Sequence, residues 1–146
     1  MKKTIYITLA MIAFTFAAAE TSLACSCIAP TGKIKTQVTN AYKDSAAIFA
    51  GKVIAMDKTS DGNYWLVKFA VQDTWKGTGT SEITIKTALE SAMCGYGFED
   101  GKEYLVYAHG TAADLSVVNC SRTASMPDKT DVTYLAKLRR KYAPMK

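Results

Sequence analysis

Four cysteines restrict the fold of this chain more than any other sequence feature. Cys25 and Cys27 lie two positions apart, whereas Cys94 and Cys120 lie far along the chain. A bridge between Cys25 and Cys27 would close a small ring of poor geometry, so two long-range disulfides are expected. Two pairings remain open at this point, Cys25 with Cys94 and Cys27 with Cys120, or the reverse. Either pairing attaches one short segment twice to distant parts of the fold.

A structural zinc site would be the other common use of four cysteines. Such a site needs ligands in closely spaced pairs, but Cys94 and Cys120 are isolated and the chain has a single histidine, His109. We therefore expect disulfides, and no metal or cofactor of the protein's own.

Residues 1–24 have the pattern of a secretory signal peptide. Lys2 and Lys3 precede an apolar run over residues 5–19, and small residues follow. The run of about 15 residues is shorter than the roughly 20 that a transmembrane helix needs, so no transmembrane segment is expected. Residues 25–146 are long enough for a single domain with its own core. We expect this domain to be monomeric, and either secreted or periplasmic.

The chemical state of Cys25 depends on how the leader is removed. Small residues three and one positions before Cys25 favour cleavage directly in front of it, which frees its α-amine. A similar pair precedes Glu20, and cleavage there would leave five extra residues. The third alternative is a lipid anchor on Cys25, although Leu23 is one position away from the usual place of leucine in such signals.

Alternating apolar residues and turn signals predict five strands. The predicted strands cover residues 47–56, 64–75, 82–87, 103–108 and 114–121. The clearest alternation places five residues on one face of the second strand: Trp65, Val67, Phe69, Val71 and Trp75. Five short strands with tight connections favour an antiparallel sandwich or a small barrel, because such strands must bury one face and protect their edges.

Helices are expected before and after these strands. Residues 34–46 carry Ile34, Val38, Ala41 and Tyr42 at helical spacing. A final helix is predicted over residues 132–142, with Asp131 as its N-terminal cap and a basic last turn. Its apolar stripe consists of Val132, Leu135, Leu138 and Tyr142.

Several segments resemble the N-terminal domain of the tissue inhibitors of metalloproteinases in order and spacing. They are CSC (25–27), FAGKV (49–53), DTWKG (73–77), SAMCG (91–95), GKEYLVYA (101–108) and LSVVNCS (115–121). The resemblance implies an all-β fold with flanking helices, built on a five-stranded antiparallel Greek-key barrel of the oligonucleotide/oligosaccharide-binding (OB) or netrin-like type. It also implies a stapled N-terminus with bridges from Cys25 to Cys94 and from Cys27 to Cys120.

The same resemblance implies inhibition of zinc metalloendopeptidases. The α-amine nitrogen and carbonyl oxygen of a free Cys25 would chelate the catalytic zinc of the target, in the position that water needs. Ser26 would enter the substrate pocket that follows the scissile bond. The implied inhibitory ridge comprises Cys25, Ser26, Cys27, Ile28, Ser91, Ala92 and Met93. The zinc belongs to the target, and the chain itself is not expected to be an enzyme.

The sequence also departs from that family. Pro30 lies three positions after Cys27, where the family has proline two positions after, and the third bridge of that domain has no counterpart. The family's C-terminal domain has no counterpart either. The alternative function is therefore a non-inhibitory secreted or envelope-attached binding module for a polysaccharide, a lipid or a protein.

Two further functions are disfavoured. His109 with Asp114 and Ser116 or Ser121 lacks the order of a hydrolase triad. The formal net charge of +5 is spread along the chain without basic blocks, and the tryptophans are assigned to the core, so no nucleic-acid partner is expected.

Overall fold

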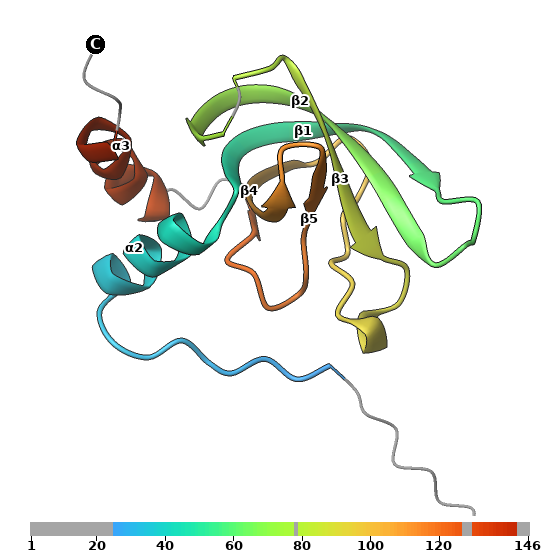
Figure 1. The fold of residues 1–146 in the computed structure, drawn as a ribbon, viewed down its shortest axis with the longest axis horizontal. Coiled ribbons are helices and arrows are strands. Elements are labelled where there is room, and N and C mark those ends of the chain that lie inside the picture. The colour runs from blue at the N-terminus through green and yellow to red at the C-terminus, as the bar shows by residue number, and fades with distance from the viewer. Residues whose placement is uncertain (1–24, 78, 127–129, 143–146) are drawn as a thin grey trace, which may run out of the picture.

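The computed structural model describes residues 25–77, 79–126 and 130–142 (Figure 1). The predicted signal peptide, residues 1–24, lies outside them. The helices are α2 (Ile34–Asp44), α3 (Thr130–Tyr142) and the 3-10 turn η1 (Ser91–Met93). The strands are β1 (Ala47–Lys58), β2 (Tyr64–Lys76), β3 (Glu82–Ala88), β4 (Glu103–Thr111), β5 (Asp114–Ser116) and β6 (Ala124–Ser125). None of the helices in the described part of the chain is long and apolar enough to cross a membrane.

Five of the strands close into a barrel of the OB type. The order is β1-β2-β3-β5-β4, and β4 pairs with β1 to complete the ring, while β6 adds to the outside of β4. Strand direction cannot alternate all the way round a ring with an odd number of members. The parallel pair is β3–β5, joined at Lys86 and Ser116, and the other pairs of the ring are antiparallel. The predicted barrel is confirmed, with this one parallel pairing as a correction.

The first half of β1 (residues 47–51) and the middle of β4 (residues 104–108) are buried on both faces. Phe49 and Val106 point into the barrel, whereas Ile48 and Tyr107 belong to a second core beneath the helices. In Figure 1 the two helices lie side by side at one end of the barrel. Two-sided burial explains why the sequences of β1 and β4 are continuous apolar runs without clear alternation.

The predicted inward face of β2 is wrong at its end. Val67 and Phe69 lie in the barrel core, but Trp75 lies in the second core under the helices. The pairing with β1 skips a residue at Gln72, because Val71 and Asp73 face consecutive residues of β1. An extra residue in one strand reverses the side-chain alternation after it, so Trp75 points out of the barrel.

The predicted role of Asp131 as a helix cap is also wrong. Helix α3 begins at Thr130, and Asp131 lies buried inside its first turn. Its carboxylate accepts hydrogen bonds from the Tyr107 hydroxyl at 2.8 Å and from Arg122 Nη2 at 2.8 Å. Arg122 Nη1 also donates to Gln37 Oε1 at 2.9 Å. The Asp131–Arg122 pair therefore joins α3, β4, α2 and the loop that carries Cys120.

Charge and burial act in the same direction on this network. Burial and the neighbouring Asp131 carboxylate raise the pKa of the Tyr107 hydroxyl, so it remains a neutral donor. The hydrogen bond to Asp131 raises the pKa of the Arg122 guanidinium despite its partial burial.

Replacing Asp131 by alanine should destabilise the fold by about 3 to 5 kcal/mol, because it leaves Arg122 without its counter-charge in a largely buried place. The side chains of Arg122 and Asp131 are only 22% and 10% exposed. Asp73→Ala removes the half-exposed partner of Arg139 and should cost at most about 1 kcal/mol. Urea unfolding of both variants tests the difference, and equal losses would contradict the importance of the buried pair.

Candidate functional site

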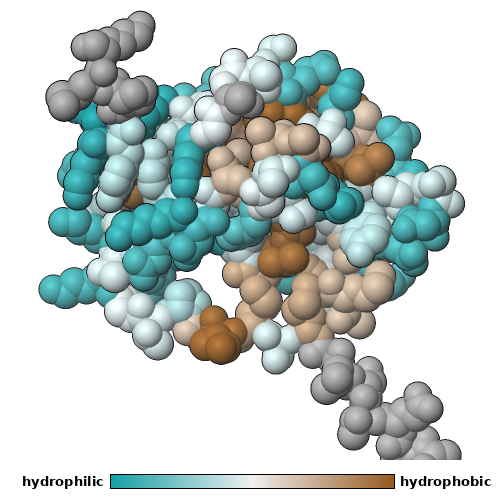
Figure 2. All heavy atoms as spheres, in the orientation of Figure 1, coloured by the Kyte–Doolittle hydropathy of each residue, from teal (hydrophilic) through white to brown (hydrophobic). Residues whose placement is uncertain are grey.

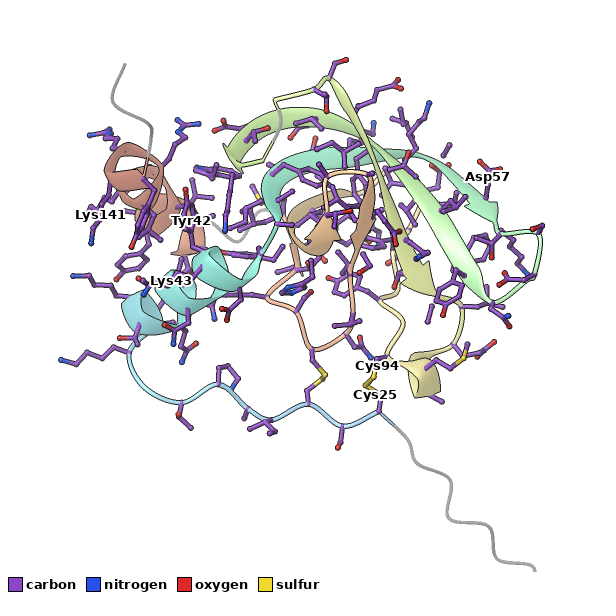
Figure 3. The ribbon with its side chains drawn as sticks, in the orientation of Figure 1. Cys25, Tyr42, Lys43, Asp57, Cys94 and Lys141 are labelled. Atoms are coloured by element: carbon purple, nitrogen blue, oxygen red, sulfur yellow. A yellow bond between two sulfur atoms is a disulfide. The ribbon has the colours of Figure 1, made fainter. Side chains whose placement is uncertain are left out.

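Residues 25–33, called the N-terminal segment below, have no regular secondary structure, yet they are tied firmly to the barrel. Disulfides join Cys25 to Cys94 and Cys27 to Cys120, with Cα–Cα distances of 5.2 Å in both pairs. This is the pairing that the resemblance implies. In Figures 1 and 3 the segment passes beneath the barrel, with Cys25 and Cys94 next to η1.

Backbone contacts complete the attachment. The Cys25 N–H donates to the Ala92 carbonyl oxygen at 3.3 Å, and the Asn119 N–H donates to the Cys94 carbonyl oxygen at 2.8 Å. Gly95 and Val118 form an isolated β-bridge. The start of the N-terminal segment, the turn at 91–95 and the loop at 118–121 are therefore held together at one edge of the molecule.

The two halves of the predicted ridge meet at Cys25, which has a hydrogen bond to Ala92 and a disulfide to Cys94. We call residues 25–28 and 91–93 the N-terminal ridge. Ser26, Ile28 and Ser91–Met93 are exposed to solvent. The Ile28 side chain is 96% exposed and Met93 is 50% exposed. Figure 2 shows apolar residues, in brown and tan, along this lower edge of the molecule. Exposed apolar side chains on a rigid edge are a common feature of surfaces that contact a partner.

The 91–95 turn that supports the ridge has a tightly constrained backbone. Cys94 ends η1 with φ of 63°, a left-handed conformation that costs energy for a residue with a side chain. A Cβ atom at Gly95 would lie 2.1 Å from the Ala88 carbonyl oxygen, so only glycine fits there. The turn thus packs directly against the end of β3, and this contact fixes the position of Ser91–Met93 relative to the barrel.

A cleft of about 600 Å³ separates the N-terminal segment from the body of the protein. Its walls include residues 27–31, α2 and the 119–123 loop. Gln37 Nε2 donates to the Gly32 carbonyl oxygen at 2.9 Å and so supports the far end of the segment. The segment therefore lies across the cleft and is attached at both ends, by the disulfides at residues 25 and 27 and by Gln37 at Gly32.

The structure gives no support to the disfavoured hydrolase triad. His109 also lines the cleft, and its Nδ1 lies 3.2 Å from the Asp44 carbonyl oxygen. Asp114 instead forms an ion pair with Lys86 at 3.0 Å. His109 and Ser116 are neighbours in the β4–β5 ladder, but within the described residues no side-chain hydrogen bond links His109 to Asp114 or to either candidate serine.

The cysteine sulfurs do not form a metal site of their own. The Sγ atoms of Cys25, Cys27 and Cys120 lie within 4.8 Å of one another. All four cysteines are in disulfides, so this proximity reflects two adjacent bridges. Thiolate ligands for a metal are therefore absent from the described part of the oxidised chain.

No protein-family model matches the chain, and a search of curated proteins finds no significant match. The resemblance to the metalloproteinase inhibitors thus depends on the order and spacing of six short segments, three of which contain the cysteines.

Gly95→Ala should destabilise the protein by about 1 to 3 kcal/mol, because the added methyl group must displace backbone at the end of β3. Gly97→Ala is the matched control, since a Cβ there meets nothing within 4 Å. Thermal unfolding compares the two, and amide NMR shifts of Ser91–Met93 report whether the turn has moved. A Gly95 variant as stable as the Gly97 variant would contradict the close approach.

Proposed function

We propose that the chain, once freed of residues 1–24, is a secreted inhibitor of zinc metalloendopeptidases. The main support is the way Cys25 is attached. Its side chain forms a disulfide with Cys94, and its backbone nitrogen donates a hydrogen bond to Ala92. An N-terminal residue held in this way presents two metal-binding atoms at a protruding, solvent-facing edge. The sulfur of Cys25 is occupied by its bridge and takes no part.

The atoms of Cys25 suit chelation of a metal with an open coordination position. A neutral terminal amine has two hydrogens and one lone pair, so a hydrogen bond to Ala92 leaves the lone pair free. Within the described residues, the Cys25 carbonyl oxygen accepts no hydrogen bond. Together the two atoms would close a five-membered chelate on the target's catalytic zinc and exclude the water that attacks the peptide bond.

Rigidity supports tight binding in this proposal. An unstructured N-terminus would lose conformational entropy on entering a protease cleft. Here the ordering is already achieved by two covalent links, and Gln37 holds the far end of the segment. Ser26 and Ile28 would fill neighbouring substrate pockets, and Ser91–Met93 would contact the rim.

A second candidate is a non-inhibitory binding module that holds its ligand in the cleft behind the N-terminal segment. The volume of about 600 Å³ favours it, as do neutral hydrogen-bonding groups such as Asn40, Asn119 and Ser121 on the walls. The two functions differ in a simple way, since only inhibition requires a free Cys25 amine.

Extending the mature protein by one alanine before Cys25 should weaken inhibition by roughly 100-fold or more. The amide that forms has no lone pair for the metal, and metal ligation contributes several kcal/mol. Inhibition constants against a panel of zinc endopeptidases measure the loss. The control carries the added alanine after Lys146 and should inhibit like the unextended protein.

Two outcomes would contradict the inhibitor proposal. One is equal inhibition by the extended and unextended proteins, and the other is no inhibition of any zinc endopeptidase. Both proteins must show two disulfides by mass and the same unfolding midpoint, so that misfolding is excluded as the cause.

Inhibition should weaken as the pH falls below the pKa of the α-amine, which is about 7.7 to 8.0 in model compounds. Only the neutral amine binds metal, and its fraction falls roughly tenfold per pH unit below the pKa. Inhibition constants between about pH 6 and pH 8.5, corrected for the pH dependence of the protease itself, test the expectation. A constant that stays flat over this range would show that the amine is not a ligand.

A further inference from the structure

Five basic residues from three separate segments gather where the two helices end. Lys43 comes from the last turn of α2, Lys76 from the end of β2, and Arg139, Arg140 and Lys141 from the last turn of α3. Arg139, Arg140 and Lys141 are consecutive in the sequence, whereas Lys43 and Lys76 come from distant segments and join them only in the folded chain. Figure 3 shows Lys43, Tyr42 and Lys141 together on the helical side, away from Cys25.

Specific contacts fix the arrangement. Lys76 Nζ donates to the Tyr42 and Lys43 carbonyl oxygens, at 2.8 and 3.1 Å, at the end of α2. The Tyr42 and Tyr142 rings stack with centroids 5.5 Å apart, which brings the last turn of α3 onto α2. Arg139 Nη1 donates to the Thr74 carbonyl oxygen of β2 at 2.9 Å. These contacts between α2, β2 and α3 therefore fix the positions of Lys76 and Arg139 relative to each other.

Most of this charge is not neutralised within the described residues. Asp73 is the one acidic side chain that pairs with these cations, through Arg139 at 2.9 Å. The side chains of Lys43 and Arg140 make no hydrogen bond or ion pair in the described part. Lys141 lies over the Tyr142 ring, 5.4 Å from its centroid. Like charges at this density repel each other, and an anionic ligand would relieve the repulsion.

A groove of about 410 Å³ lies among these cations. Its walls are Tyr42, Thr74, Trp75, Lys76, Gly77, Gly79, Arg139 and Tyr142. It therefore combines cationic groups with the exposed ring of Tyr142, while Tyr42 and Trp75 are buried beneath it. Arg139 uses Nη1 for Asp73 and Thr74, so its other nitrogens remain as donors for a carboxylate or a sulfate.

We propose that this basic groove binds an acidic polysaccharide, with one sugar unit in the groove and the flanking anionic groups on Lys43, Arg140 and Lys141. The groove is concave and small, which suits a chain of rings better than the flat surface of a membrane. The exposed Tyr142 ring offers an apolar contact to the C–H face of a sugar. Since Cys25 lies on a different side of the molecule, binding here leaves the N-terminal ridge accessible (Figure 3).

The test compares two triple variants that remove the same charge. Lys43→Ser, Arg140→Ser and Lys141→Ser remove exposed cations of the groove, while Lys52→Ser, Lys68→Ser and Lys102→Ser remove exposed cations from the strands and a turn of the barrel. Binding to dextran sulfate, polygalacturonate, neutral dextran and vesicles of anionic lipid is measured by calorimetry at several salt concentrations.

The unmodified protein should bind both acidic polymers, more weakly as salt rises, and should not bind neutral dextran. The groove variant should lose roughly tenfold or more in affinity, and the barrel variant should change less than about twofold. Equal weakening of both variants, no binding at low salt, or binding only to vesicles of anionic lipid would overturn the proposal. Unfolding midpoints of the two variants confirm that both are folded, and protease inhibition tests the proposed function separately.

Discussion

The two disulfides at the start of the described chain are the constraint on which the candidate site depends. They fasten a segment without secondary structure to two loops of the barrel, at Cys94 and at Cys120. These loops are themselves joined by the Gly95–Val118 bridge and braced by Gly95 against β3. The Arg122–Asp131 pair extends the brace from the Cys120 loop to the helices. The position of Cys25 is thus determined by the whole fold and not by its immediate neighbours.

The two candidate sites lie on different sides of the molecule. One side carries the N-terminal ridge and the cleft behind it, and the other carries the basic groove between β2 and α3. Strand β1 connects the two, since one of its faces lies in the barrel core and the other packs under the helices. The proposed polysaccharide and the proposed protease would therefore bind on different sides of one molecule.

Local patterns predicted most elements but not what depends on tertiary contacts. The alternation in β2 and β3 and the spacing in α2 gave the right elements, whereas the disulfide pairing came from the resemblance alone. Trp75 was placed on the wrong face because the extra residue at Gln72 leaves no mark in the sequence. Asp131 is a residue type typical of helix caps, but in the folded chain its carboxylate pairs with the partly buried Arg122. Gly95 was recognisable only as a glycine next to a cysteine, and the basic groove appears only when α2, β2 and α3 are brought together.

The central claim is that an unmodified nitrogen of Cys25 is the first atom of the exported protein. The protein is expressed with its own leader and purified after export. Intact-mass spectrometry of this protein, with and without reduction, tests the claim most directly. We expect the mass of residues 25–146, lower by four hydrogens before reduction, with no adduct. A mass that matches a chain starting at Glu20, or a chain with an acyl group on Cys25, would contradict the claim. Either result would favour a binding module built on the same barrel.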